Sequence, residues 1–236
     1  MTTKTDADIS EIVSAALDHA LEIVEDEEGW KVEIEDENVT IKVRKNEEDR
    51  KVWLCTTAVD VSPKILREKL AKSDYITSWN TSITEAKTIS NIAGDVKVVH
   101  LLTSEKEGNT VSNRDLVYGS KMMLKNGMFM IGGISVEVAE LPEEDGCVRV
   151  VQGPGCQIVE AVAGHAGKSL LTWMMDFDYK DSNIIETAVP SQLCWPAVWT
   201  QLEKRPSHAS FLSRLSWPAE LALLGHRVKW VAKYGC

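Results

Sequence analysis

The clearest hydrophobic pattern in the chain lies at residues 8–25, where apolar side chains recur at steps of three and four residues with acidic residues between them. This period is typical of an amphipathic α-helix, whose apolar face must be covered by a sheet or a bundle. A second helix is expected to begin at Ser62, because serine is favoured at the N-cap and Pro63 fits the first helical position. We expect this helix to run through Leu70.

Most of the remaining chain consists of short runs with alternating or β-branched apolar residues, the pattern of antiparallel strands. Glycine-containing turns separate several of these runs, as at 125–127 and 163–167, because glycine takes a positive φ without strain. A helix, a group of strands, a helical pair, further strands and a final helix predict an α+β fold. The predicted strands are 31–34, 39–44, 52–59, 86–90, 96–102, 116–124, 128–138, 148–152, 156–163 and 169–179.

The composition indicates one globular domain with an acidic surface. At 236 residues the chain is long enough for a sizeable core, and its formal net charge of −10 argues against a nucleic-acid partner, which needs a basic surface. No apolar run approaches the ~18–20 residues that span a bilayer. The N-terminal residues are acidic where a mitochondrial presequence would be rich in arginine, and the five cysteines include no C-x-x-C pair. We therefore expect a cytoplasmic protein with reduced thiols.

Motifs for catalysis or metal binding are weak in this chain. Residues 167–169, Gly-Lys-Ser, end like a phosphate-binding loop, but Val162 stands where that motif needs glycine, so we interpret them as a hairpin turn. Asp176 and Asp178 share one face of a predicted strand and could pair as acid and base, although two surface carboxylates are the simpler interpretation. The histidines and cysteines show no metal-ligand spacing, so we expect neither a metal nor another cofactor.

Several short motifs follow one another in a distinctive order between residues 113 and 179. They are Asn113-Arg114-Asp115-Leu116-Val117, Gly132-Gly133, Leu141-Pro142, Val148-Arg149, Gly153-Pro154-Gly155-Cys156, Ala163-Gly164 and Leu171-Thr172-Trp173. In their order and spacing the chain resembles START domains, the steroidogenic acute regulatory protein-related lipid transfer family, and within it the branch that transfers cholesterol or binds carotenoids. The resemblance implies a helix-grip fold, in which a curved antiparallel sheet encloses one lipid and a long C-terminal helix closes the cavity.

The resemblance also implies a division of the chain into a START lipid-binding domain at 1–205 and a basic, apolar C-terminal extension at 206–236. Residues 183–205 would form the closing helix, yet Pro190 and Pro196 fall inside it. Each proline costs roughly 3 kcal/mol in a regular helix interior, so we expect a kinked or broken closing helix. The extension either packs on the domain as an extra helix or binds a membrane surface.

One departure from the family pattern concerns charge inside the cavity. In the cholesterol-transfer branch an acidic residue and an arginine pair there, near the place where the sterol hydroxyl is thought to sit. Alignment on His100 and Arg114 puts Leu101 and Ser120 at these two positions, so both charges are absent. Apolar groups can replace a buried ion pair without loss of stability. The replacement favours a drier cavity and an apolar or longer ligand such as a carotenoid, while cholesterol stays a candidate with Ser120 as a weaker hydrogen-bond partner.

Strand alternation and the family positions together give a set of candidate lipid-binding residues. Some of the candidates are methionines, which adapt to irregular apolar ligands, although about half of the set could face the outer side of the sheet or the N-terminal helix. Arg114 and Asp115 are expected to anchor the loop at 103–113 through an ion pair. The lipid-binding candidates are Leu101, Tyr118, Ser120, Met122, Phe129, Ile131, Gly133, Thr172 and Met174, with Trp195 and Trp199 from the closing helix.

Three functions are compatible with this sequence. The favoured one is a cytosolic protein that binds and transfers one hydrophobic lipid, a sterol, a carotenoid or a similar molecule, with transient contact to a membrane surface. The second is a ligand-sensing regulatory module, in which lipid occupancy changes what the basic extension contacts. The third is a lipid-metabolic enzyme on the same scaffold, since a scaffold alone does not determine function. In that case Asp176 would be required for its activity.

Overall fold

The computed structural model describes residues 5–36, 39–80, 83–92, 94–103, 113–125 and 127–180. The predicted closing helix at 183–205, with its two prolines and both tryptophan candidates, lies outside these residues. So does the C-terminal extension at 206–236. The expectations for both segments therefore stay predictions.

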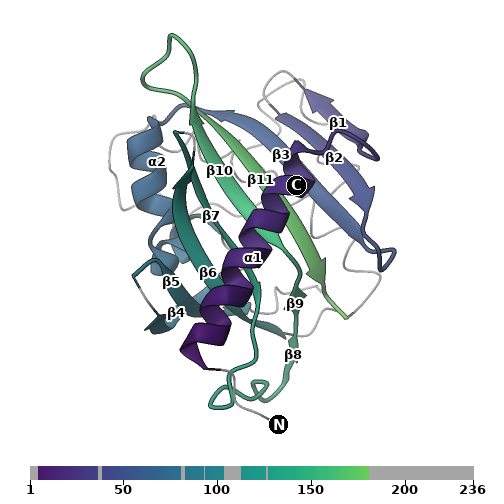
Figure 1. Cartoon of the computed structure of the whole chain (residues 1–236), viewed down its shortest axis with the longest axis vertical. Coiled ribbons are helices and arrows are strands. Elements are labelled where there is room, and N and C mark those ends of the chain that lie inside the picture. The colour runs from purple at the N-terminus through teal and green to yellow at the C-terminus, as the bar shows by residue number, and fades with distance from the viewer. Residues whose placement is uncertain are drawn as a thin grey trace, which may run out of the picture.

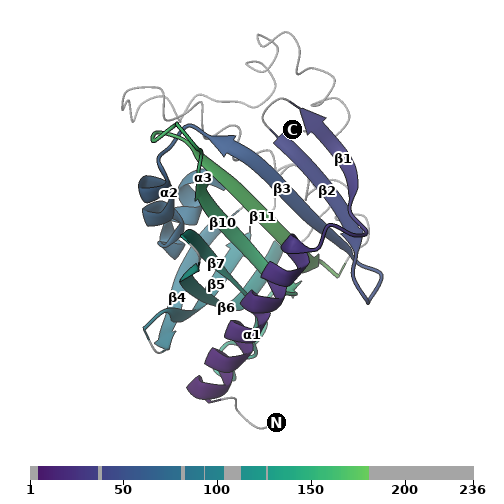
Figure 2. The same cartoon turned by 45° about the horizontal axis from the view of Figure 1, so that its top comes forward.

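The described strands form one curved, essentially antiparallel sheet with the order β1-β2-β3-β11-β10-β7-β6-β5-β4 (Figure 1). The first and last thirds of the described chain meet in the middle of the sheet, where β3 pairs with β11, and the turned view shows the sheet curving between its two edges (Figure 2). The strands are β1 (Lys31–Asp36), β2 (Val39–Lys45), β3 (Lys51–Val59), β4 (Ile83–Ile92), β5 (Val96–Thr103), β6 (Asn113–Lys125), β7 (Met128–Ser135), β8 (Cys147–Arg149), β9 (Val151–Gln152), β10 (Gly155–Ala161) and β11 (Ser169–Asp178).

Every strand predicted from the sequence overlaps an observed strand, and the differences have local causes. The predicted strand at 148–152 is divided at Val150 into β8 and β9. The division arises because β8 pairs in parallel with the beginning of β6, whereas β9 pairs with the end of β11. One extended segment therefore joins two separate parts of the sheet.

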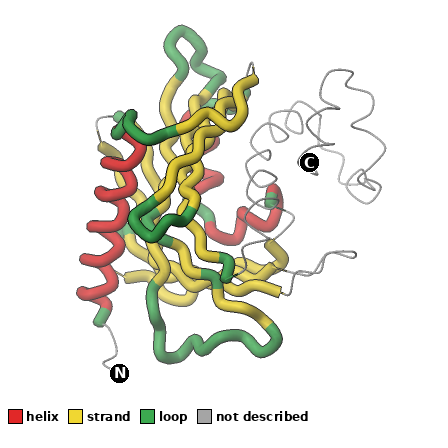
Figure 3. Tube along the Cα trace, turned by 90° about the vertical axis from the view of Figure 1, so that its right-hand side faces the viewer, coloured by secondary structure: helices red, strands yellow, loops and turns green. Residues whose placement is uncertain are grey.

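The N-terminal helix α1 (Asp6–Glu25) covers one face of the sheet, as predicted (Figure 3). It begins with a capping box, in which the Thr5 hydroxyl accepts from the Asp8 amide at 3.2 Å and the Asp8 carboxylate accepts from the Thr5 amide at 2.8 Å. Its buried face repeats every three or four residues and consists of Ile9, Val13, Ala16, Leu17, Ala20 and Leu21.

Three short helices follow β3 and lie on the other face of the sheet (Figure 3). They are α2 (Pro63–Leu70), the 3₁₀ turn η1 (Ser73–Tyr75) and α3 (Ile76–Trp79). The predicted boundaries of α2 are confirmed, although the Ser62 side chain makes no capping hydrogen bond. The start of this helix therefore depends on Pro63, whose fixed φ suits the first helical position.

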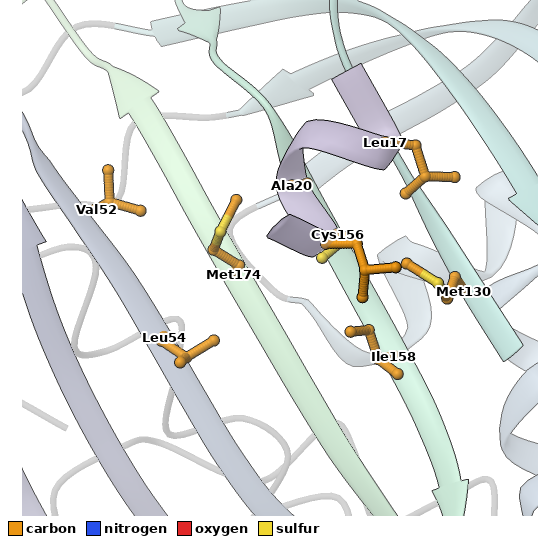
Figure 4. Packing of buried hydrophobic residues seen from close by; sticks show 9 residues of the cluster. Leu17, Ala20, Val52, Leu54, Met130, Cys156, Ile158 and Met174 are labelled. Atoms are coloured by element: carbon orange, nitrogen blue, oxygen red, sulfur yellow. The ribbon is translucent and has the colours of Figure 1, made fainter. Parts of the chain in front are cut away.

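The face of the sheet under α1 is a closed hydrophobic core (Figure 4). Leu17 and Ala20 of α1 pack there with Met130, Cys156 and Met174 from three neighbouring strands. Leu17 is fully buried, and burial of one such side chain stabilises the fold by about 1.5–3 kcal/mol. With this face filled by the helix, any ligand site within the sheet must use the opposite face.

Candidate functional site

A cavity lies on the face of the sheet opposite to α1, between the strands and the α2–α3 segment. Its apolar wall comes from four strands and from two positions of that segment, and its volume is about 120 Å³. The described apolar side chains that line it are Leu70, Ile76, Leu101, Leu116, Ile131, Trp173, Met175 and Phe177.

Strand register explains why these residues meet on one face. Leu101 of β5 stands opposite Leu116 of β6, and Ile131 of β7 stands opposite Gln157 of β10, which in turn stands opposite Trp173 of β11. Because paired residues in a sheet point to the same side, this register carries one face continuously from β5 to β11.

Four of the sequence-predicted residues line the cavity from this face: Leu101, Tyr118, Ser120 and Ile131. Burial raises the pKa of Tyr118 to about 12, so its hydroxyl stays protonated and can donate a hydrogen bond. Ser120 is only 2% exposed. Within the described chain, no hydrogen bond from either hydroxyl to a protein group is found.

Three further candidates lie on the same face of the sheet as the cavity but are not among the residues that line it. Met122 and Phe129 lie toward the far end of the β6–β7 pair, where they pack in a cluster under α2 that includes Leu66. Gly133 stands between Ser120 on one side and Gly155 on the other. A ligand role for these three residues stays a proposal.

Two candidates were placed on the wrong face. Met174 is among the residues that border the cavity, but its side chain belongs to the cluster with Leu17 beneath α1, on the opposite face of the sheet (Figure 4). Thr172 stands opposite Ile158, which belongs to the same cluster beneath α1. Because β11 is apolar on both faces, its sequence pattern does not show which set of alternate residues faces inward.

The structure also adds lining residues that the sequence did not indicate. Trp173 and Gln157 join the wall from β11 and β10, while Lys97 joins it from β5, with Lys69 and Lys72 from α2 and the turn after it. The described walls therefore carry ammonium and amide groups beside the apolar side chains. Lys97 stands directly opposite Ser120, one of the two positions that lack the family's charge.

A buried charge network anchors the base of the 103–113 loop. The Asp115 carboxylate is fully buried and accepts from Arg149 Nη2 at 2.6 Å, with His100 Nε2 at 3.4 Å. Burial alone would raise the pKa of Asp115, but the hydrogen bond and the charge of Arg149 outweigh it, so the pKa is lowered. The adjacent residue Arg114 is tied through its backbone, whose amide donates to Thr103 Oγ1 at 2.9 Å. Arg149 is thus a partner of the predicted loop anchor that sequence reasoning missed.

Asp176 is not a surface carboxylate, contrary to the simpler interpretation of the sequence. Its side chain is buried and accepts from Arg50 Nε at 3.2 Å and from Asn46 Nδ2 at 3.0 Å. Asp178, by contrast, pairs with Lys180 near the surface. Neither carboxylate is among the described residues that line the cavity.

The described cysteines have the character of packing residues. Burial raises the pKa of the Cys55 and Cys156 thiols to about 12, and Cys147 is also free. No group of metal-ligating side chains occurs within the described ranges. In the same part of the chain, no helix is long and apolar enough to cross a membrane.

Comparison with known proteins identifies the fold and its family. Residues 11–192, well over half of the chain, match the family model described as START domain. The chain belongs to the START-domain family. Its helix-grip sheet is confirmed by human StAR-related lipid transfer protein 5, with a TM-score of 0.76 over 84% of this chain and 97% of that chain at 18% identity. Human STARD10 gives a TM-score of 0.63 at 17% identity, over 86% of this chain and 79% of that chain.

Curated relatives include the mitochondrial steroidogenic acute regulatory proteins of Homo sapiens and Ovis aries. They are 30% and 31% identical to this START domain over 167 residues, which is 70% of the chain. The chain spans only 59% of the length of these relatives. Membership of the family supports a role in lipid binding or transfer.

Proposed function

We propose that this START domain is a lipid carrier that holds one hydrophobic ligand, a sterol, a carotenoid or a similar lipid, in the cavity opposite α1 and exchanges it at membrane surfaces. The observation that carries the proposal is the continuous wall of apolar side chains from β5 to β11, on the one sheet face that α1 does not fill. Hydrocarbon buried against such a wall contributes roughly 25 cal/mol per Å², which favours a ligand with a large apolar area.

The cavity volume supports a carrier that changes shape on loading. Pockets that enclose a drug-sized ligand typically have volumes of roughly 300–1,000 Å³, whereas this cavity has about 120 Å³. A ligand of sterol size therefore requires the walls to move apart. Such widening suits exchange at a membrane, where opening exposes apolar surface to lipid instead of water.

Ser120→Trp tests the cavity assignment directly. Ser120 is a nearly fully buried lining residue, so an indole at this position should fill the space and abolish loading of a fluorescent sterol or a carotenoid, with little loss of fold stability. The matched control is Leu124→Trp, on the same strand and the same face but 65% exposed and outside the cavity wall.

The assay measures bound ligand per protein after gel filtration, with circular dichroism and thermal unfolding as folding controls. If Ser120→Trp is too bulky to fold, Ser120→Leu provides a smaller obstruction of the same space. Unchanged loading of the folded variants would show that the ligand binds elsewhere. Equal losses in the Leu124→Trp control would indicate a nonspecific effect of the added indole.

We propose a carrier and not an enzyme. The residue that the enzymatic hypothesis required, Asp176, is engaged by Arg50 and Asn46, away from the described cavity wall. We further propose that the carrier acts in the cytoplasm, an assignment supported by the free thiols of the described cysteines.

A further inference from the structure

Three lysines lie among the described residues that line the cavity. They are Lys69, Lys72 and Lys97, and that described set contains no aspartate or glutamate. This asymmetry stands out on a chain whose formal net charge is −10. A cationic wall inside an acidic protein is the arrangement that attracts an anion to one place.

Lys97 is the best-placed of these cations. Its ammonium donates to the Ala71 carbonyl at 2.8 Å, which uses one of its three N–H donors. Among the described residues, no carboxylate lies within ion-pair distance of it, although the charge of Asp74 acts on it from further away. Burial lowers the pKa of Lys97, which shows that its charge is partly desolvated and gains from an anionic partner.

Small residues adjoin Lys97 across the sheet. In the register of the strands, Lys97 stands opposite Ser120, Ser120 opposite Gly133, and Gly133 opposite Gly155. A side chain at Gly133 is excluded, because an added Cβ would meet the carbonyl of the neighbouring strand. No bulky side chain therefore rises from this row beside the ammonium.

Hydrogen-bond donors and apolar surface are separated along the cavity. Ser120 stands opposite Lys97, and Tyr118 follows two residues away on the same face of β6. The hydroxyls of both residues have no protein partner within the described chain. Four residues further along β5, about 13 Å away, Leu101 stands opposite Leu116 and begins the apolar part of the wall. The cavity is thus amphipathic, with a donor-rich end and a hydrocarbon-lined end.

We propose that Lys97, with the Ser120 and Tyr118 hydroxyls, forms a subsite for the carboxylate or phosphate oxygens of an acidic lipid whose hydrocarbon lies along the Leu101–Leu116 wall. This inference rests on the proposed lipid-carrier function and narrows it, since the ligand then has an anionic group at one end. The charge-assisted hydrogen bond from Lys97 selects that group, while the apolar area supplies most of the affinity.

Equilibrium dialysis of radiolabelled oleate and oleyl alcohol tests the subsite on the full chain. The two probes share their hydrocarbon and differ in charge, so the wild type should bind oleate at least about 10-fold more tightly. Lys97→Met should remove most of this preference and leave the affinity for oleyl alcohol within about 2-fold. Lys97→Arg should retain the preference for oleate. Lys64→Met, at an exposed position of α2, serves as the matched control.

Each other result overturns the inference in a distinguishable way. Equal affinity of the wild type for both probes, or an equal loss of both in Lys97→Met, would show that Lys97 does not select an anion. Acetate binding as tight as that of oleate would indicate a site for free anions instead of a lipid. Binding of a sterol without oleate would refute the subsite but leave the carrier function, whereas binding of no lipid at all would refute the carrier function itself.

Discussion

Removal of the Arg149 guanidinium should destabilise the domain more than removal of a surface charge. Arg149→Met keeps the aliphatic part of the side chain but leaves the fully buried Asp115 carboxylate without its 2.6 Å partner. Breaking a buried pair in this way costs about 3–5 kcal/mol. Because His100 Nε2 and the Glu144 amide stay near the carboxylate, each at 3.4 Å, we expect the lower end of that range, about 3 kcal/mol.

Urea and thermal unfolding measure this effect. A loss of about 3 kcal/mol corresponds to a fall in Tm of roughly 6–12 °C for a domain of this size. Lys168→Met is the matched control, because the Lys168–Asp60 ion pair at 3.0 Å is partly exposed and should contribute less than about 1 kcal/mol. Combining Arg149→Met with Asp115→Asn should recover much of the stability, since the uncompensated charge is then absent.

The pH dependence separates a charge effect from a packing effect. In the wild type the lowered pKa of Asp115 contributes stability that is present above the ordinary pKa of aspartate and is lost as pH falls through the folded value. Without Arg149, burial dominates and raises the pKa above the unfolded value, so the variant gains stability as pH falls. The difference in the free energy of unfolding between the wild type and Arg149→Met should therefore become smaller as the pH is lowered from about 7.5 to about 5. A loss below about 1 kcal/mol, or a difference that does not change with pH, would refute this reasoning.

Two further predictions concern the sheet and its thiols. Gly133→Ala should prevent stable folding, because the added Cβ would lie 1.8 Å from the Gly119 carbonyl oxygen. Gly167→Ala, in an open turn, is the control and should leave the stability nearly unchanged. A Gly133→Ala protein with the Tm of the wild type would contradict the close approach of the two strands. Cys55 and Cys156, with pKa values raised to about 12 by burial, should resist iodoacetamide in the native protein and react after unfolding. Peptide mapping measures both sites, and rapid native labelling of either would show that it is accessible.

The sequence was sufficient to predict most of the fold, because the spacing of apolar residues is regular in most of the helices and strands. The helix under the sheet, the strand positions and the start of α2 at Pro63 all follow from local periodicity and turn chemistry. The family motifs then predicted the helix-grip arrangement that the solved relatives confirm. Pairings between distant segments, such as β3 with β11, came from the family and not from local pattern.

The cavity could be predicted only in part, for reasons visible in single residues. Met174 was misplaced because both faces of β11 are apolar, and periodicity cannot then choose between them. Lys97 alternates with buried valines, and a lysine in such a strand normally indicates a surface position. Asp176 is buried because Arg50, far away in the sequence, reaches it. Contacts between distant segments decide all three cases.

Mass spectrometry of organic extracts, made from the protein purified out of its native source, tests the central claim most directly. A visible absorbance spectrum of the same sample distinguishes a carotenoid from a colourless lipid. The carrier account predicts one lipid molecule per protein, and the subsite at Lys97 predicts that this lipid has an acidic group. An extract with no lipid in stoichiometric amount would contradict the account.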